Sequence, residues 1–381
     1  MLELAEVVRR FEATYRGAVA FRVTTVQARA LGAIRTCRTP VRGGHVWRCD
    51  AAACGQERYS YHSCRHRLCP KCQRDQTERW LARAQTRLLP CPYWLITVTL
   101  PAELRRICRV HPKAVLDLLL RAAQTAVIEL GWTHLGGRVG LLAVLHTWTR
   151  ALLFHPHVHV LVTAGGLDRD GQTWRPARRA DYLLPQQAVA NRVHKAMREG
   201  LERLGYLGEV PWEVWARKWI AHVQPAGAGA QVLAYLGRYV FRGPLPNSRI
   251  TAITERTVTF TYRHGRTGHA QPTTLPGEHL VARIIQHVLP HRFIRVRWSG
   301  LLSPAAGKAR ARAVAALAAA PRRSGHAPRL TPPREDEVPD PPARGEAHPP
   351  PVDSQSRQRC PVCGVGTLRL IGRLPPRRGP P

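Results

Sequence analysis

The sequence predicts an α+β protein built around a four-stranded antiparallel sheet that is backed by two helices. Three observations support this class: strand-like and helix-like runs alternate between residues 94 and 223, cysteines crowd residues 37–74, and Ala, Arg and Pro dominate after Pro304. The runs follow the order strand–helix–strand–strand–helix–strand, which is the split βαβ (ferredoxin-like) arrangement. We therefore expect this sheet to form the centre of the molecule.

Each predicted element has a local signal in the sequence. Apolar, β-branched runs bounded by Pro or polar residues indicate strands, whereas apolar residues at helical spacing followed by Gly indicate helices. These signals place strands at 94–100, 139–148, 155–163 and 219–223, and helices at 114–130, 186–204 and 231–241. Later runs predict a hairpin at 251–262, a helix at 280–288 and a strand at 293–298.

The segments on either side of this unit differ from it in composition. Residues 1–30 have amphipathic helical spacing, and a polar helix follows the cysteine-rich segment as far as Leu89. The Pro- and Arg-rich tail has the composition of a disordered chain. We expect three regions: a helical and zinc-binding region at 1–89, an α+β domain at 90–302, and a disordered, basic tail with a Cys-x-x-Cys pair at 303–381.

The balance of charge points to a polyanionic partner. The formal net charge is +33 and the isoelectric point is near 11.3. Such an excess of Arg and Lys repels itself unless nucleic acid shares the surface, although a GC-rich genome that favours Arg accounts for part of it. No stretch is apolar over a membrane-spanning length, and residues 1–30 lack a secretory pattern. We expect a cytoplasmic protein that contacts DNA or RNA and no membrane.

Three histidines alternate along one predicted strand. In the run His155-Pro156-His157-Val158-His159 the period of two places all three imidazoles on one face of the sheet. Neighbouring neutral imidazoles chelate a divalent metal, and three of them on one face favour this reading over a solvated polar face. The pair His157 and His159 is therefore the predicted centre of a metal site. His146, on the preceding strand, and His155 are the alternatives for a third ligand.

Two tyrosines are spaced for one face of a helix. Tyr235 and Tyr239 stand at i and i+4, so their Cβ atoms lie about 5–6 Å apart on a helix. A phenol, with an ordinary pKa of about 10, attacks a phosphodiester well only when the phosphate is polarised and the ring is positioned. A Lewis-acidic metal supplies that polarisation. The alternative is that the two rings belong to an ordinary core, and the nearby histidine strand favours the catalytic interpretation.

Together these features resemble a known family, the two-tyrosine HUH rolling-circle transposases of bacterial insertion sequences. The resemblance spans roughly residues 2–302 and rests on Ser63-Cys64-Arg65-His66-Arg67-Leu68-Cys69-Pro70-Lys71-Cys72-Gln73, Leu145-His146-Thr147-Trp148, Phe154-His155-Pro156-His157-Val158-His159, Tyr235-Leu236-Gly237-Arg238-Tyr239-Val240 and Phe293-Ile294-Arg295-Val296-Arg297. It implies that residues 90–302 are an HUH catalytic domain in which His157 and His159 bind Mg²⁺ or Mn²⁺ and Tyr235 and Tyr239 are nucleophiles. The implied reaction nicks single-stranded or hairpin DNA at the element's ends, passes through a 5′-phosphotyrosine and joins the end to target DNA. The implied setting is the bacterial nucleoid.

The cysteine-rich segment predicts a structural zinc site. Two short-range pairs of thiolates about fifteen residues apart suit tetrahedral zinc, and we assign them as Cys49 with Cys54 and Cys69 with Cys72. Cys37 and Cys64, together with His45, His62 and His66, could build a second site or replace ligands of the first. Cys360 and Cys363 are half of a zinc ribbon, either a remnant or a pair whose further ligands the sequence does not identify. Basic side chains near these knuckles and near the tyrosines are expected to contact DNA, namely Arg65, Arg67, Lys71 and Arg238.

Two other functions share parts of this pattern. A rolling-circle replication initiator or relaxase has the same histidine strand and tyrosine chemistry. A non-catalytic zinc-dependent DNA-binding protein would need only the cysteines and the charge. The cysteine-rich segment favours a transposase over the first, and the presence of both histidines and both tyrosines argues against the second.

Overall fold

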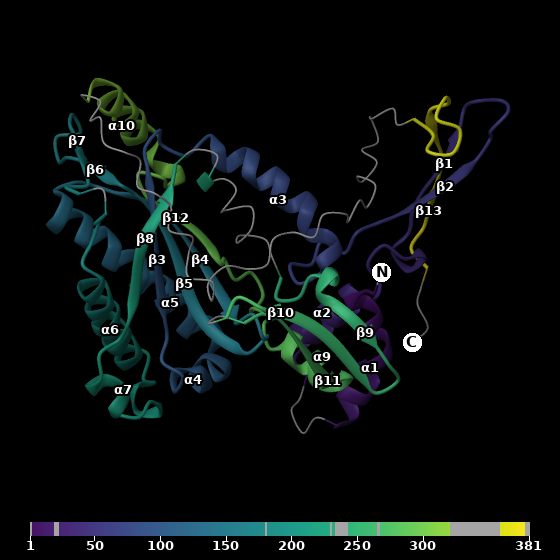
Figure 1. Ribbon diagram of the computed structural model, residues 1–381, viewed down its shortest axis with the longest axis horizontal. Coiled ribbons are helices and arrows are strands. Elements are labelled where there is room, and N and C mark those ends of the chain that lie inside the picture. Colours follow the sequence, from purple (N-terminus) through teal and green to yellow (C-terminus); the bar gives the residue numbers. More distant parts are fainter. Residues whose placement is uncertain are drawn as a thin grey trace.

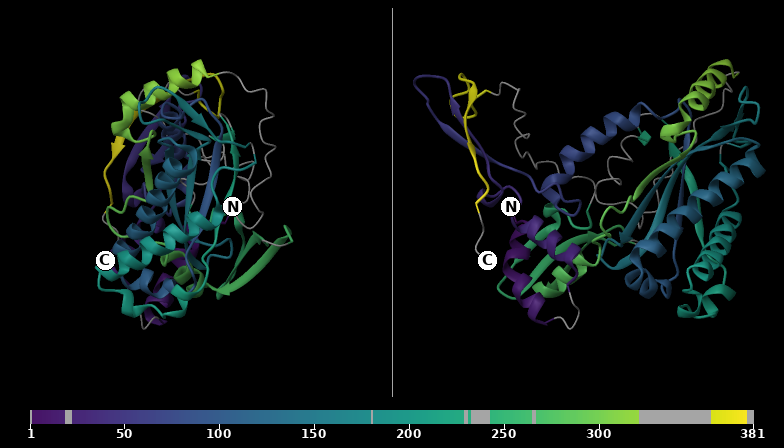
Figure 2. Two further views of the ribbon diagram at one scale, coloured as in Figure 1. Left: turned by 90° about the vertical axis from the view of Figure 1, so that its left-hand side faces the viewer. Right: turned by 180° about the vertical axis from the view of Figure 1, so that it is seen from behind.

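The computed structural model describes residues 2–18, 23–179, 181–228, 231–232, 243–264, 267–320 and 359–377. In these ranges the chain forms a large lobe around a central sheet, a smaller lobe of helices and strands, and a projecting β-arm (Figure 1). The sheet lobe and the arm lie at opposite ends of the molecule, and the smaller lobe lies between them (Figure 2).

Within the described residues, the central sheet is antiparallel throughout and has five strands. They are β3 (Tyr93–Thr99), β4 (Gly140–Trp148), β5 (Phe154–Thr163), β8 (Ala221–Gly227) and β12 (Val296–Gly300). Their order in space is β12-β4-β5-β3-β8. β3, β4, β5 and β8 match the four strands predicted for the sheet within a few residues. β12 adds a fifth strand beside β4.

Helices cover one face of this sheet. α5 (Pro112–Leu130) contacts β4 and β5, and it packs against α6 (Gln186–Arg203), which contacts β8. The buried residues Val158, Val160 and Val162 of β5 belong to the same core as these two helices. Because side chains alternate along a strand, the histidines of β5 lie on the opposite face. Two short helices, α4 (Leu104–Val110) and α7 (Glu213–Ala216), complete this layer.

The smaller lobe joins segments that are far apart in the sequence. α1 (Leu4–Ala18) and α2 (Thr25–Arg35) share a core with α9 (Gly277–Ile285) and with the sheet of β9 (Ile250–Ile253), β10 (Thr257–Arg263) and β11 (Ala270–Pro276). The approach of α1 to α9 is so close that a Cβ on Gly277 would overlap the ring of Phe11. The backbone N–H of Leu4 donates to the side-chain oxygen of Asn247 at 3.0 Å. The expected boundary at residue 89 is therefore not the boundary of packing, because residues from 245 to 285 complete the N-terminal core.

The arm also corrects the expectation for the tail. β1 (Gly44–Cys49) pairs on one side with β2 (Glu57–Tyr61) and on the other with β13 (Leu368–Leu374), both antiparallel. Within the tail predicted to be disordered, the structure contains the helix α10 (Gly307–Ala319) and this strand β13. The overall Ala-, Arg- and Pro-rich composition concealed both, because α10 is a short Ala-rich stretch within it and β13 pairs with a strand more than 300 residues away.

A long helix connects the lobes. α3 (Pro70–Gln85) begins in the smaller lobe and runs toward the central sheet, where Trp80 stacks on Trp298 of β12 with ring centroids 5.7 Å apart (Figure 1). The remaining strands, β6 (Gly165–Leu167) and β7 (Trp174–Pro176), form a small hairpin beside α10. The predicted helix at 231–241 lies outside the described residues apart from its first two positions. Among the helices that the structure describes, none is long and apolar enough to cross a bilayer.

Candidate metal centres

Three histidines meet on the face of the sheet that α5 and α6 leave uncovered. His146 of β4 stands directly opposite His157 of β5, and His159 follows two residues later on β5. The ring centroid of His159 lies 4.9 Å from those of both His146 and His157. One ring nitrogen from each residue falls within 4.8 Å of the other two, which is close enough for all three to bind one metal ion.

Hydrogen bonds orient two of these imidazoles. Nδ1 of His157 lies 2.8 Å from the backbone carbonyl oxygen of His155. Because a carbonyl oxygen only accepts, Nδ1 carries the proton and Nε2 keeps its lone pair for a metal. Nδ1 of His159 lies 3.2 Å from the hydroxyl of Thr97 on β3. Such second contacts fix the ring plane and tautomer of a metal-binding histidine.

The surroundings hold these histidines in the neutral form. Only 3% of His159 and 5% of His146 is exposed. Burial lowers the pKa of His157 to about 4. Burial, together with the nearness of His157 and His146, lowers the pKa of His159 well below its usual value. A neutral imidazole is the form that binds metal, so the donor set fits a divalent ion.

The structure distinguishes the two alternatives for a third ligand. His146 lies in the cluster, whereas Nδ1 of His155 lies 2.9 Å from a guanidinium nitrogen of Arg105. His155 shares the strand face with His157 but belongs to no group of potential metal ligands among the described residues. The geometry therefore groups His157 and His159 with His146.

Sequence reasoning missed two neighbours of this cluster. Thr97 pairs with His159 on one side and with His222 of β8 on the other, so the three side chains share one face of the sheet. His222 lies within the strand predicted at 219–223. The strand order β5-β3-β8, which places it near His159, is the signal that could have found it.

Metal binding at the histidine cluster should resist acid. Protons compete with the metal only when the imidazoles titrate, and the lowered pKa values of His157 and His159 move that competition below the ordinary histidine range. We expect Mn²⁺ affinity to be nearly constant from pH 8 to about 5.5, and to fall below that as the pH approaches 4. Titration with Mn²⁺ followed by electron paramagnetic resonance would measure this. A midpoint near pH 6.5 would contradict it.

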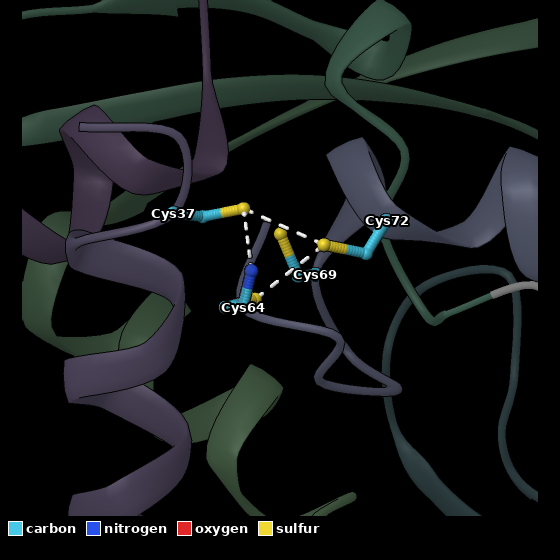
Figure 3. A group of neighbouring side chains, drawn as sticks. All are labelled: Cys37, Cys64, Cys69 and Cys72. Carbon is cyan, nitrogen blue, oxygen red and sulfur yellow. Dashed lines mark hydrogen bonds between the residues drawn. The ribbon is translucent and has the colours of Figure 1, made fainter. Parts of the chain in front are cut away.

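Four cysteine sulfurs converge where α2 ends and α3 begins. Cys37 follows α2, Cys64 lies in the loop after β2, Cys69 is the residue before α3, and Cys72 is in its first turn (Figure 3). The Sγ atoms of Cys37 and Cys72 are 3.4 Å apart, and those of Cys64 and Cys72 are 3.6 Å apart.

These separations fit a metal better than a disulfide. A disulfide holds its sulfurs about 2.05 Å apart, whereas tetrahedral zinc with bonds of about 2.3 Å separates them by about 3.8 Å. The backbone N–H groups of Cys64 and His66 donate to the sulfurs of Cys37 and Cys64. The donor set therefore fits a structural Zn²⁺.

The remaining cysteine group corrects the predicted pairing. The structure does not bring Cys49 and Cys54 to Cys69 and Cys72; it places them with Cys360 and Cys363 in the arm. The four predicted ligands are thus divided between two clusters. Cys49 and Cys54 lie with Cys360 and Cys363 of the tail, and Cys69 and Cys72 lie with Cys37 and Cys64. Spacing along the chain misled here, since β1 carries the first pair away from α3.

The basic residues expected at DNA differ in their surroundings. Arg65 is exposed. Arg67 donates to the backbone carbonyl of Phe293, and Lys71 pairs with the carboxylate of Glu3. Two of these side chains thus stabilise contacts within the protein. Arg238, and with it Tyr235 and Tyr239, lies outside the described residues.

Comparison with known proteins now adds to this geometry. Residues 140–310 match the family described as "Putative transposase", and residues 7–100 match the "Transposase zinc-binding domain". The chain is 34% identical over 322 residues to "Putative transposase y4qJ" of Sinorhizobium fredii, which covers 79% of this chain and 80% of that protein. It is 31% identical over 287 residues to the transposase for insertion sequence element IS801 of Pseudomonas savastanoi pv. phaseolicola. That alignment covers 70% of this chain and 68% of that protein. No solved structure matches the chain.

The two family matches identify a transposase with a zinc-binding domain, and the cysteine-rich segment lies within the zinc-binding match. Within that class, the chain belongs to the family of insertion-sequence transposases that includes the IS801 transposase and its IS91-type relatives. The resemblance noted from the sequence is thereby confirmed at the level of the family.

Proposed function

We propose that this transposase nicks and joins single-stranded DNA at the ends of its element by metal-assisted tyrosine attack. The observation that carries the proposal is the cluster of His146, His157 and His159 on one face of the sheet. Three protein ligands leave positions for phosphate oxygens, which distinguishes a catalytic metal from a closed structural one. Mg²⁺ or Mn²⁺ is the proposed ion because both occur with phosphate oxygens in nucleases.

The topology supports an HUH nuclease fold. The order β8-β3-β5-β4, with α5 between β3 and β4 and α6 between β5 and β8, is that of a split βαβ unit. In such a unit β5 is a central strand, flanked by β4 and β3. The histidines therefore stand on a rigid element, which holds catalytic groups more accurately than a loop does.

The proposed chemistry needs a nucleophile close to this cluster. Val232 is fully buried in the apolar cluster that includes Val144, and Val144 pairs with His159. Tyr235 follows Val232 by three residues, and three residues of chain span at most about 11 Å. Val232, shortly before the two tyrosines in the sequence, therefore belongs to the apolar cluster on the face of the sheet that carries the histidines.

The steps then follow from the residues. His146, His157 and His159 would hold the metal, which would supply Lewis-acid polarisation of the scissile phosphate. The phenol oxygen of Tyr235 or Tyr239 bonds to phosphorus while the bond from phosphorus to the 3′ oxygen breaks, and overall the phenol's proton passes to the leaving 3′ oxygen. The products are a 5′-phosphotyrosine and a free 3′-hydroxyl. Attack by a 3′-hydroxyl of target DNA on the phosphotyrosine reverses the sequence and completes joining. The second tyrosine allows a second end to be held in the same way.

The covalent adduct tests this proposal. We expect the full chain, incubated with labelled single-stranded element ends and Mn²⁺, to form an adduct that survives a denaturing gel. Tyr235→Phe with Tyr239→Phe should remove it, because a phenyl ring lacks the attacking oxygen, whereas Tyr206→Phe is a matched control that should leave it unchanged. Failure of the unaltered protein to form any adduct with its own ends would overturn the mechanism.

A further inference from the structure

The cysteine cluster of the arm is assembled from the two ends of the chain. Cys49 ends β1 and Cys54 lies in the turn before β2, whereas Cys360 and Cys363 precede β13. The sulfurs of Cys49 and Cys363 are 3.7 Å apart, and those of Cys54 and Cys360 are 3.9 Å apart. Residues in these contacts are separated by 314 and 306 positions in the sequence.

The backbone around the cluster is arranged for these four sulfurs. The N–H of Gly366 donates to the sulfur of Cys363 at 3.3 Å, as expected for a thiolate in a metal-binding turn. A Cβ on Gly366 would overlap the sulfur of Cys49, so glycine leaves the space that the sulfur occupies. Asp50 accepts from the N–H of Thr367 at 2.6 Å and from Arg369 at 3.0 Å, which aligns the two ligand-bearing segments.

The arm has too little apolar core to hold these segments by packing alone. Its buried cluster consists of Trp47, Cys49, Cys360 and Leu368, and two of the four are the proposed ligands themselves. Units this small usually need a metal or disulfides to fold. The sulfur separations exceed a disulfide bond, and all ten cysteines are free. Four thiolates with no open position are the ligand set of structural zinc.

We propose that Cys49, Cys54, Cys360 and Cys363 bind a second structural Zn²⁺, which fastens the C-terminal segment to the N-terminal arm. Each segment supplies half of the ligands, so neither forms the site alone. The metal closes the chain into a loop of more than 300 residues. It also holds residues 359–377 in the arm, where they supply strand β13 and two of the four ligands. The proposal concerns metal binding and chain closure, and it does not depend on the tyrosine mechanism.

Zinc content provides the first test. We expect Cys360→Ala with Cys363→Ala to contain one zinc ion fewer per chain than the unaltered protein, measured by mass spectrometry of the metal after dialysis. A chain ending at Ala320 should lose the same single ion. Cys91→Ala with Cys108→Ala is the matched control, because both residues are buried outside the clusters, and it should lose none. Unchanged zinc content in the Cys360 and Cys363 variant would overturn the proposal.

Chain closure provides the second test and remains informative if a variant folds poorly. A protease site is inserted between Pro339 and Asp340 of the otherwise unaltered chain, and the purified protein is cut. With zinc bound, we expect the C-terminal fragment to stay with the main chain during size-exclusion chromatography. A zinc chelator should release it, and Cys49→Ala with Cys54→Ala should release it without the chelator. A fragment that stays bound after zinc is removed would show that the metal does not fasten it.

Discussion

His159→Ala should lower the rate of covalent adduct formation by at least about 100-fold, since removal of one imidazole leaves two ligands for the proposed catalytic ion. Loss of a contact that only supports a metal ligand already costs about 10- to 100-fold in affinity or activity. His159 is the most enclosed of the three and lies 4.9 Å from each of the other two rings. The measurement is a single-turnover time course of adduct formation on labelled element ends at several Mn²⁺ concentrations.

His155→Ala is the control for this variant. His155 lies on the same strand and faces the same side, but its ring contacts Arg105 and stands outside the metal cluster. Its backbone carbonyl, which orients His157, is retained in alanine. We expect a rate within about threefold of the unaltered protein, since the loss of one exposed or half-buried contact is a small effect. If both variants lost activity equally, the assignment of His146 rather than His155 to the cluster would be wrong.

Cys72→Ala should remove zinc from the smaller lobe and unfold it at a much lower temperature. Cys37, Cys69 and Cys72 are buried in the same core as α1, α2 and α9, so the metal and the apolar packing stabilise one unit. Structural zinc contributes about 10–16 kcal/mol of binding free energy in small domains. A loss of even a third of this would lower the melting temperature by on the order of 10 °C in a unit of this size.

Calorimetry of the full chain would measure this shift, with Cys108→Ala as the matched control. Cys108 is a buried cysteine in the core under the central sheet, and it belongs to no cluster of metal ligands among the residues that the structure describes. Its loss removes one sulfur from a packed site and should cost about 1 kcal/mol, which corresponds to a few degrees. A zinc chelator added to the unaltered protein should reproduce the Cys72→Ala transition. Equal melting of the two variants would mean that the cluster holds no stabilising ion.

Much of the central sheet could be predicted from sequence because its signals are local. β3 and β5 are short apolar runs with clear ends, and the alternation of His157 and His159 with valines fixed which side chains share a face. The helices α5 and α6 begin and end near the predicted residues for the same reason. β11 has no clear local signal because it is exposed and polar, and its pairing with β10 holds it in place.

The cysteine sites could not be assigned from local spacing. Cys69 and Cys72 are close in the sequence and lie in one cluster, but their partners are set by the path of the chain through α2 and β1. Cys360 and Cys363 looked isolated because their partners lie more than 300 residues away. The identity of the third histidine ligand cannot be derived from the sequence for the same reason. Only the register of β4 against β5 places His146 opposite His157.

The joining of α1 and α2 to residues 245–285 has a consequence for synthesis of the protein. α1 buries Leu4, Val8 and Phe11 against partners such as α9, and the N–H of Leu4 bonds to Asn247, 243 positions later. At about 5–20 residues per second, a ribosome needs roughly 12–50 s to make the chain between them. During that interval the apolar side of α1 has emerged without its final partners. The native packing of α1 and α2 is thus completed only after residues 245–285, which are made much later, have emerged.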